Sequence, residues 1–140
     1  MEIKNRKAYY DYFIEDQTEA GIILTGTEIK SIRKGSANIK DCYVRIKNDE
    51  AFIINMFISK YEEGNINNHD ERRERKLLLH AKEINKLKAG TMQDGYSIMP
   101  LKLYIVRGHA KLLIGLAKGK KLYDKREATK QRDIERENRL

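Results

Sequence analysis

Apolar and polar residues alternate over short stretches near the start of the chain, a pattern typical of strands rather than of long helices. The stretches Tyr10–Glu15 and Ala20–Leu24 have this character, and we expect two strands there. Between them, Glu19 precedes Ala20-Gly21, where the glycine permits either a bulge or a close approach of another backbone.

A short helix is predicted directly after the second strand. Thr25, with Glu28 three residues later, has the spacing of a capping box, and Gly35 is placed to end the helix. On a helix of this phase, Lys30 and Arg33 lie on the exposed side.

The clearest hairpin of the chain comes next. Cys42–Lys47 and Ala51–Ile58 alternate or run apolar around Asn48-Asp49, a pair of residues that tolerates positive φ in tight turns. The following segment, Glu62–Arg75, is polar and becomes basic, so we expect a long exposed loop there.

Three consecutive leucines, Leu77–Leu79, follow this loop. They cannot all face one side of a helix, so either one of them is exposed to a partner or the three pack into a core in different directions. Ile84 and Leu87 then have helical spacing, and Gly90 is a candidate C-cap.

Two further strands are predicted toward the end of the apolar part of the chain. Leu101, Leu103 and Ile105 alternate with polar or aromatic residues, and Pro100 predicts a bulge or an edge position because proline cannot donate to a ladder. Lys111–Ala117 alternates in the same way.

Together these elements predict an all-β dominated fold. About six strands, two or three short helices and several glycine kinks favour a small closed OB-like antiparallel β-barrel over residues 1–117. Residues 118–140 are predicted to form a basic C-terminal tail.

The charge balance points to an anionic partner. The 140 residues include 29 Lys and Arg against 21 Asp and Glu, a net charge of +8. Lys118–Arg126 holds five cations and one acid, hence +4, whereas Glu127–Leu140 holds four of each sign. Nucleic acid is favoured over an anionic membrane because no basic helix with a long apolar face is visible. Around Tyr123, cations and an aromatic ring favour an RNA contact, although a solvated basic linker has the same composition.

Motifs for catalysis or metal binding are not found in the sequence. His69, His80 and His109 are dispersed, so we expect no metal and no cofactor. Gly115–Lys120 resembles a phosphate-binding loop but is one residue short and lacks the Ser or Thr that holds magnesium. Cys42, the only cysteine, is expected to be a packed thiol in a reducing cytoplasm. With no apolar run approaching about 20 residues, we expect no membrane segment.

Five blocks of the sequence, in order and with consistent spacing, resemble the SmpB family of bacterial SsrA-binding proteins. They are Asn5–Ala8, Glu19–Ile22, Gly26–Arg33, Arg75–His80 and Gly119–Arg126. The resemblance implies a non-enzymatic, cytoplasmic protein with an OB-like barrel that binds, as a monomer, the tRNA-like domain of transfer-messenger RNA (tmRNA). It further implies entry into stalled ribosomes for trans-translation, with the protein replacing the anticodon arm and its tail contacting small-subunit rRNA.

The same resemblance implies two sets of functional residues. The RNA-binding set consists of Asn5, Arg6, Lys7, Glu19, Lys30, Arg33, Arg75, Lys76 and Leu78. The set acting in the decoding centre and the messenger channel consists of Lys120, Lys121, Tyr123, Asp124, Lys125 and Arg126. This chain departs from the family pattern at Glu71 and Glu74, where relatives often carry prolines, so the extended shape of that loop is in question.

The tail is predicted to be disordered in free solution and helical on the ribosome. Residues 127–140 contain too few apolar residues to dock onto the barrel, although their opposite charges are paired at helical spacing. A general single-strand RNA-binding OB protein is the main alternative function, and a nuclease is a more distant one.

Overall fold

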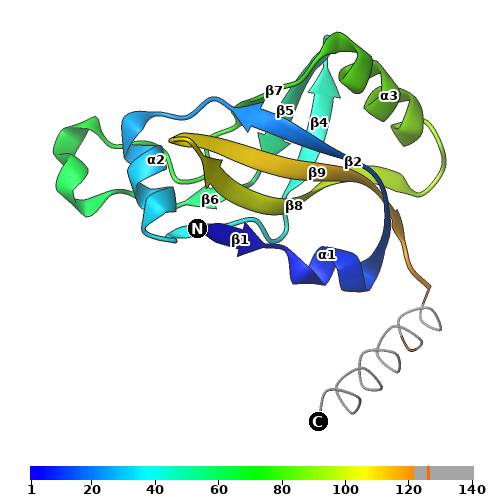
Figure 1. The fold of residues 1–140 in the computed structure, drawn as a ribbon, viewed down its shortest axis with the longest axis horizontal. Coiled ribbons are helices and arrows are strands. Elements are labelled where there is room, and N and C mark those ends of the chain that lie inside the picture. The colour runs from blue at the N-terminus through cyan, green and yellow to red at the C-terminus, as the bar shows by residue number, and fades with distance from the viewer. Residues whose placement is uncertain (122–125, 127–140) are drawn as a thin grey trace.

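The computed structural model describes residues 1–121 and 126 (Figure 1). The helices are α1 (Arg6–Asp11), α2 (Gly26–Arg33) and α3 (Ala81–Thr91), with a short 3-10 helix η1 at Glu62–Asn67. The strands are β1 (Glu2–Lys4), β2 (Tyr12–Ile22), β3 (Ala37–Asn38), β4 (Tyr43–Lys47), β5 (Glu50–Ile54), β6 (Phe57–Ile58), β7 (Arg75–Leu78), β8 (Tyr96–Val106) and β9 (His109–Gly119).

Six of these strands close into an antiparallel ring. The sheet runs β8-β4-β5-β7-β2-β9, and β9 pairs with β8 again, so each of the six has a neighbour on both sides. β1 pairs with residues 102–104 of β8, and β3 pairs with β6 in a separate two-stranded sheet. The predicted mostly-β fold with short helices is confirmed. The ring includes β7, which the sequence pattern did not indicate as a strand, and it has one strand, β2, where two were expected.

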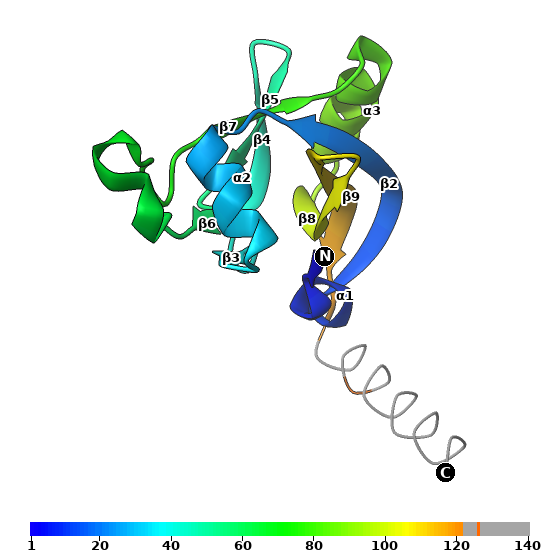
Figure 2. The same cartoon turned by 60° about the vertical axis from the view of Figure 1, so that its left-hand side comes forward.

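The helices lie around the ring at separate places. Figure 1 shows α2 at one end of the strands and α3 at the other, and Figure 2 shows α1 below β8 and β2. Within the ring, the side chains that point inward form one apolar core, which includes Ile53, Leu77, Leu103, Leu112 and Ile114.

Pro100 produces the predicted bulge. The pairing of β8 with β9 shifts register between Pro100 and Lys102. Because of this shift, Ile98 and Leu103 are both buried although their positions in the strand differ by an odd number, five. The Asn48-Asp49 hairpin is also confirmed, with φ of 52° and 59° at its two turn residues.

Several predicted elements differ from the structure. Tyr10 and Asp11 of the first expected strand belong to α1, whose N-cap is Asn5. The rest of that strand and most of the second expected strand form the single strand β2, with an irregularity between Glu15 and Thr18. Gly21 stays in register, so the close approach was the correct interpretation there. Gly90 is a buried residue inside α3, where an added Cβ would lie 2.5 Å from a Leu116 methyl group, so its prediction as a C-cap was wrong.

The segment expected to be a long exposed loop is only partly exposed. It contains η1, and the buried ring of His69 hydrogen-bonds the Thr27 hydroxyl and the Ile58 carbonyl, each at 2.9 Å. Glu71 lies in a turn and Glu74 in an irregular segment directly before β7, and neither is in an α-helix. The connection is therefore non-helical even though these two positions carry glutamate rather than proline.

A buried ion pair joins α2 to β7. The predicted capping box is present, with the Glu28 carboxylate accepting from the Thr25 N–H at 2.8 Å. The same carboxylate binds Arg73 at 2.7 Å and the fully buried guanidinium of Arg75. Burial alone would raise the pKa of Glu28, but hydrogen bonds from Arg73, the Thr25 N–H and Arg75 outweigh it and lower the pKa.

Replacing Arg75 tests how much this pair contributes to stability. We expect Arg75→Met to lower the free energy of unfolding by about 3 to 5 kcal/mol, because it leaves a buried carboxylate with one fewer partner. Arg45→Met is the matched control, since Arg45 forms an exposed pair with Glu74 at 3.2 Å on a nearby strand. Urea unfolding should give a loss below about 1 kcal/mol for the control. Equal losses in the two variants would contradict the assignment.

Candidate nucleic-acid interface

Four residues that are register partners form a row across the outside of the ring. Tyr104 on β8 pairs with Lys111 on β9, Lys111 with Gly21 on β2, and Gly21 with Leu78 on β7. The chain neighbours of this outer row point into the core, as the buried Leu103, Leu112, Ala20 and Leu77 show. Strand alternation therefore directs the outer row to the solvent side.

Leu78 is an exposed apolar side chain in the middle of an ordered sheet. Its exposure is 54%, whereas that of Leu77 is 1%. The side chain of Leu78 lies across Gly21, where an added Cβ would approach the Leu78 Cβ to 3.2 Å. Of the two interpretations of the leucine triplet, the structure supports exposure for Leu78. A depression of about 410 Å³ opens beside it, lined by Glu19, Gly21, Leu78, Leu79, His80, Glu83 and Lys111.

Glu19 brings a carboxylate to this apolar surface. It precedes the buried Ala20 on β2, so it faces outward, and its Oε2 accepts a hydrogen bond from the Tyr104 hydroxyl. Partial burial and this hydrogen bond raise the pKa of Tyr104 to about 12. The sequence resemblance pointed to Glu19 and Leu78, and the structure places both at one depression.

Arg75 does not fit the prediction of a phosphate contact. Its side chain is fully buried, and its guanidinium donates to Glu28, to the Met56 carbonyl at 2.6 Å and to the carbonyls of Asp70 and Glu71. Every nitrogen of the guanidinium is used inside the protein, so Arg75 is a structural residue in this conformation. The prediction was wrong because sequence charge alone does not distinguish a buried arginine from an exposed one.

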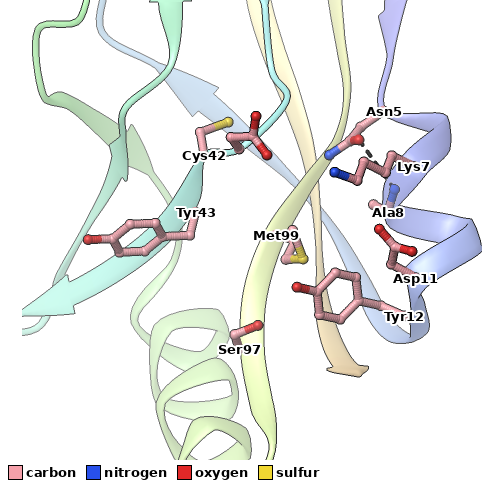
Figure 3. Close-up of a pocket in the computed structure, with 10 residues that line it drawn as sticks. Asn5, Lys7, Ala8, Asp11, Tyr12, Cys42, Tyr43, Ser97 and Met99 are labelled. Carbon is pink, nitrogen blue, oxygen red and sulfur yellow. Dashed lines mark hydrogen bonds between the residues drawn. The ribbon is translucent and has the colours of Figure 1, made fainter. Parts of the chain in front are cut away.

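Asn5 is also a structural residue here. It is 3% exposed, its Oδ1 accepts from the Ala8 N–H at 3.3 Å as the N-cap of α1, and its amide donates to the Pro100 carbonyl at 2.9 Å. Figure 3 shows Asn5 at the edge of a pocket of about 260 Å³. Lys7, Asp11 and Tyr12 line one side of this pocket, and Cys42 and Tyr43 lie opposite (Figure 3). The buried Asn5 side chain thus uses both its oxygen and its nitrogen in hydrogen bonds within the protein.

The remaining predicted cations lie on three different elements. Arg6 and Lys7 are exposed on α1, and Lys30 and Arg33 are exposed on α2. Lys76 lies on the outer face of β7, two residues before Leu78, with a Glu50 oxygen 3.5 Å from its ammonium. The structure thus brings Lys76 close to Leu78 but does not gather all the cations in one cluster.

The root of the predicted tail is attached to the start of β2. The Lys120 N–H donates to the Asp11 carbonyl at 2.8 Å, and its ammonium donates to the Tyr9 carbonyl at 3.2 Å and lies 5.2 Å from the centre of the Phe13 ring. Lys121 and Arg126 are exposed. Tyr123, Asp124 and Lys125 lie outside the described residues.

Chemistry for catalysis is not evident in residues 1–121. Cys42 is buried, its thiol donates to the Ile39 carbonyl at 3.0 Å, and burial followed by the charge of Asp41 raises its pKa to about 12. The packed thiol expected from the sequence is confirmed. In this part of the chain, three or more His, Cys, Asp or Glu side chains do not come together as a metal site would need. The helices described here are also too short or too polar to cross a membrane.

Two residues of the surface were missed by sequence reasoning. Tyr104 and Lys111 had a weak signal, because each is the outward member of an alternating strand. A nucleic-acid interface needs apolar contacts, acceptors for the base edges and partners for the phosphates. This surface has an exposed leucine, a fixed carboxylate and cations on neighbouring elements, which provide these three properties. The surface is that of an RNA-binding class of protein.

Comparison with known proteins identifies the family. The SmpB protein family model matches residues 2–140, so the chain belongs to the SmpB family. It is 63% identical over 134 residues to the SsrA-binding protein of Shouchella clausii, covering 96% of this chain and 86% of that protein. For the SsrA-binding protein of Staphylococcus saprophyticus the identity is 60%, with 96% and 87% covered. A solved structure described as "tmRNA-SmpB: a journey to the center of the bacterial ribosome" has 44% identity and a TM-score of 0.74, with 86% of this chain and 85% of that chain covered.

The adjacent leucines provide a matched test of the surface. Leu77→Ala should lower the free energy of unfolding by about 2 to 5 kcal/mol, because Leu77 is in the core. Leu78→Ala should change it by less than about 1 kcal/mol, because more than half of that side chain is in water. Thermal or urea unfolding of both variants measures the difference. A large loss for Leu78→Ala would mean that the residue belongs to the core.

Proposed function

We propose that this protein binds the tRNA-like domain of tmRNA and is needed for its stable association with stalled ribosomes. The protein thereby enables trans-translation, in which the ribosome is rescued and the incomplete peptide is tagged. The observation that carries the proposal is membership of the SmpB family along residues 2–140. The structure described as a tmRNA-SmpB complex at the centre of the ribosome supports it, since 86% of this chain matches that fold.

The composition of the depression beside Leu78 supports RNA rather than duplex DNA as the ligand. Sequence-specific recognition of RNA uses unpaired bases in loops, which need apolar and hydrogen-bonding surface as well as charge. Leu78 and Glu19 provide these two properties side by side. The proposed RNA contacts are Glu19 and Leu78 with the exposed cations Arg6, Lys7, Lys30, Arg33 and Lys76.

In this proposal, the barrel and the tail have different roles. Residues 1–117 form an OB-like barrel, for which the closed ring of six antiparallel strands is the support. Residues 118–140 form the tail, whose cations and Tyr123 reach the decoding centre and the empty messenger channel while the barrel replaces the anticodon arm. The protein acts in the cytoplasm as a monomer on its RNA.

General binding of single-stranded RNA is the second candidate function. It would use the same cations and exposed apolar surface, and it differs in selectivity. A general binder holds unstructured RNA about as well as a tRNA-like fold. A nuclease is disfavoured, because metal-binding clusters are not present in the part of the chain that the structure describes.

Binding titrations test the proposal directly. We expect the protein to bind the isolated tRNA-like domain more tightly than an unstructured RNA of equal length. Four to six phosphate contacts should give a slope of about −3 to −5 in log K against log salt concentration. Leu78→Ala should weaken binding by about 1 to 3 kcal/mol. Equal affinity for both RNAs would favour the general binder.

Truncation separates RNA binding from ribosomal action. Deleting residues 122–140 keeps the Lys120 contacts to Asp11 and Tyr9, so the barrel should fold as before. We expect the truncated protein to bind the tRNA-like domain almost as tightly as the full chain. Tagging of peptides on stalled ribosomes should be lost, because the segment that enters the messenger channel is missing. Normal tagging by the truncated protein would refute the role of the tail.

A further inference from the structure

We propose that Lys120 is a positioning residue, which fixes the direction in which the tail leaves the barrel by binding the C-terminal end of α1. The inference rests on the proposed function, in which the tail acts on the ribosome. The family resemblance places Lys120 among the tail cations that contact rRNA. Its contacts in the structure instead direct its ammonium to groups of the protein itself.

Lys120 differs in exposure from its neighbours at the end of β9. Lys118, Gly119 and Lys121 are exposed, whereas Lys120 is half-buried. A lysine that served only to contact RNA would keep its ammonium in the solvent, since this charge is strongly hydrated. The partial burial of Lys120 therefore indicates that the protein itself uses this side chain.

The hydrogen-bond partners of Lys120 are the last carbonyls of α1. A helix leaves its final four carbonyls without partners inside the helix. In α1 the Tyr12 N–H caps the Ala8 carbonyl, and Lys120 binds two of the others. Its N–H donates to the Asp11 carbonyl at 2.8 Å and its ammonium donates to the Tyr9 carbonyl at 3.2 Å. The last turn of α1 contains no basic residue, so Lys120 supplies the cation that a helix C-terminus favours.

An aromatic ring on β2 holds the same ammonium from a second direction. The centre of the Phe13 ring lies 5.2 Å from the Lys120 ammonium, a distance at which a cation is attracted to the face of the ring. Phe13 is 47% exposed, so its ring contributes little to the core and is available to Lys120. The ring and the two carbonyls together leave the Lys120 side chain few other directions.

α1 can direct the tail because its other end is fixed to β8. The Asn5 N–H donates to the Leu101 carbonyl at 2.9 Å, and the Asn5 side-chain amide donates to the Pro100 carbonyl at 2.9 Å. Ala8, in the middle of the helix, is buried. Figure 2 shows α1 beside the end of β9. Because both ends of α1 are held, its contacts with Lys120 also hold the first residues of the tail.

Two substitutions remove this contact from opposite sides. Lys120→Met removes the ammonium, and Phe13→Leu removes the aromatic face while keeping an apolar side chain and the net charge. We expect Phe13→Leu to lower the rate of peptide tagging on stalled ribosomes about two- to fivefold, the value for loss of one exposed cation–π contact. Lys120→Met should lower it at least as much, because it also loses the hydrogen bond to Tyr9. Affinity for the isolated tRNA-like domain should stay unchanged, and the melting temperature should stay within about 4 °C.

Phe57→Leu is the matched control. The centre of the Phe57 ring lies 5.3 Å from the Arg72 guanidinium, so this substitution removes the same kind of contact from β6 and should leave tagging unchanged. A double variant tests whether Lys120 and Phe13 act together. Phe13→Leu should lower tagging no further when Lys120→Met is already present, because the contact is already lost. Losses that multiply in the double variant would overturn the proposal.

Salt dependence separates this role from a contact to rRNA. If Lys120 neutralised a phosphate, Lys120→Met would reduce the magnitude of the slope of log K against log salt by about 0.7 to 0.9 when the complex with tmRNA binds ribosomes. Phe13→Leu would then tag peptides normally. We expect the slope of the unchanged protein to be kept. A reduced slope for Lys120→Met, or normal tagging by Phe13→Leu, would mean that Lys120 does not act through α1.

Hydrogen exchange reports directly on the contact. The bond to the Asp11 carbonyl protects the Lys120 amide, and Phe13→Leu should raise the exchange rate of that amide about two- to fivefold. The amide of Leu112, in the part of β9 that is paired on both sides, should exchange as in the unchanged protein. An unchanged rate at Lys120 would show that Phe13 does not hold the end of the strand, and the proposal would fail.

The outcomes separate this inference from the proposed function. If the protein without residues 122–140 fails to tag peptides while Phe13→Leu and Lys120→Met tag normally, the tail acts as proposed and only the positioning role of Lys120 fails. If the truncated protein tags peptides normally, the proposed role of the tail itself fails.

Discussion

The buried pair between Glu28 and Arg75 connects parts of the chain that are far apart in sequence. It joins the first turn of α2 to the first residue of β7, and Arg75 also binds carbonyls at Met56, Asp70 and Glu71. A buried charge must be paired, so this arrangement has few alternatives once the chain is collapsed. The position of β7, and with it the outward direction of Leu78, depends on that constraint.

Because side chains alternate along a strand, the inner side of the ring forms the core and the outer side is available for binding. On β7, for example, the inward Leu77 is followed by the outward Leu78, which is free to carry function. Stability and binding are therefore encoded by neighbouring residues that contribute to different properties. Leu77 and Leu78 are adjacent in sequence, but Leu77 is a core residue and Leu78 is a surface residue.

Local signals in the sequence predicted much of the fold. The Thr25 capping box, the Asn48-Asp49 hairpin and the Pro100 bulge were identified because each depends on residues close together in the chain. The helix α1 was missed because its six residues are too few to show periodicity, although Asn5 was a possible N-cap signal. The burial of Arg75 depends on a partner 47 residues away, and the Glu19–Tyr104 contact spans 85 residues. Pairings at such separations leave no local pattern, so only the structure could reveal them.

β9 connects the outer row to the residues that follow the ring, and its length fixes the distance between them. The same strand carries Lys111 in the outer row and continues to Lys120, whose backbone and side chain are tied to Asp11 and Tyr9. At roughly 3.3 Å per residue, the nine-residue interval from Lys111 to Lys120 spans about 30 Å. Because β9 is paired on both sides along most of this interval, it cannot stretch or fold back. β9 therefore fixes the distance between Lys111 in the outer row and Lys120, which is tied to α1.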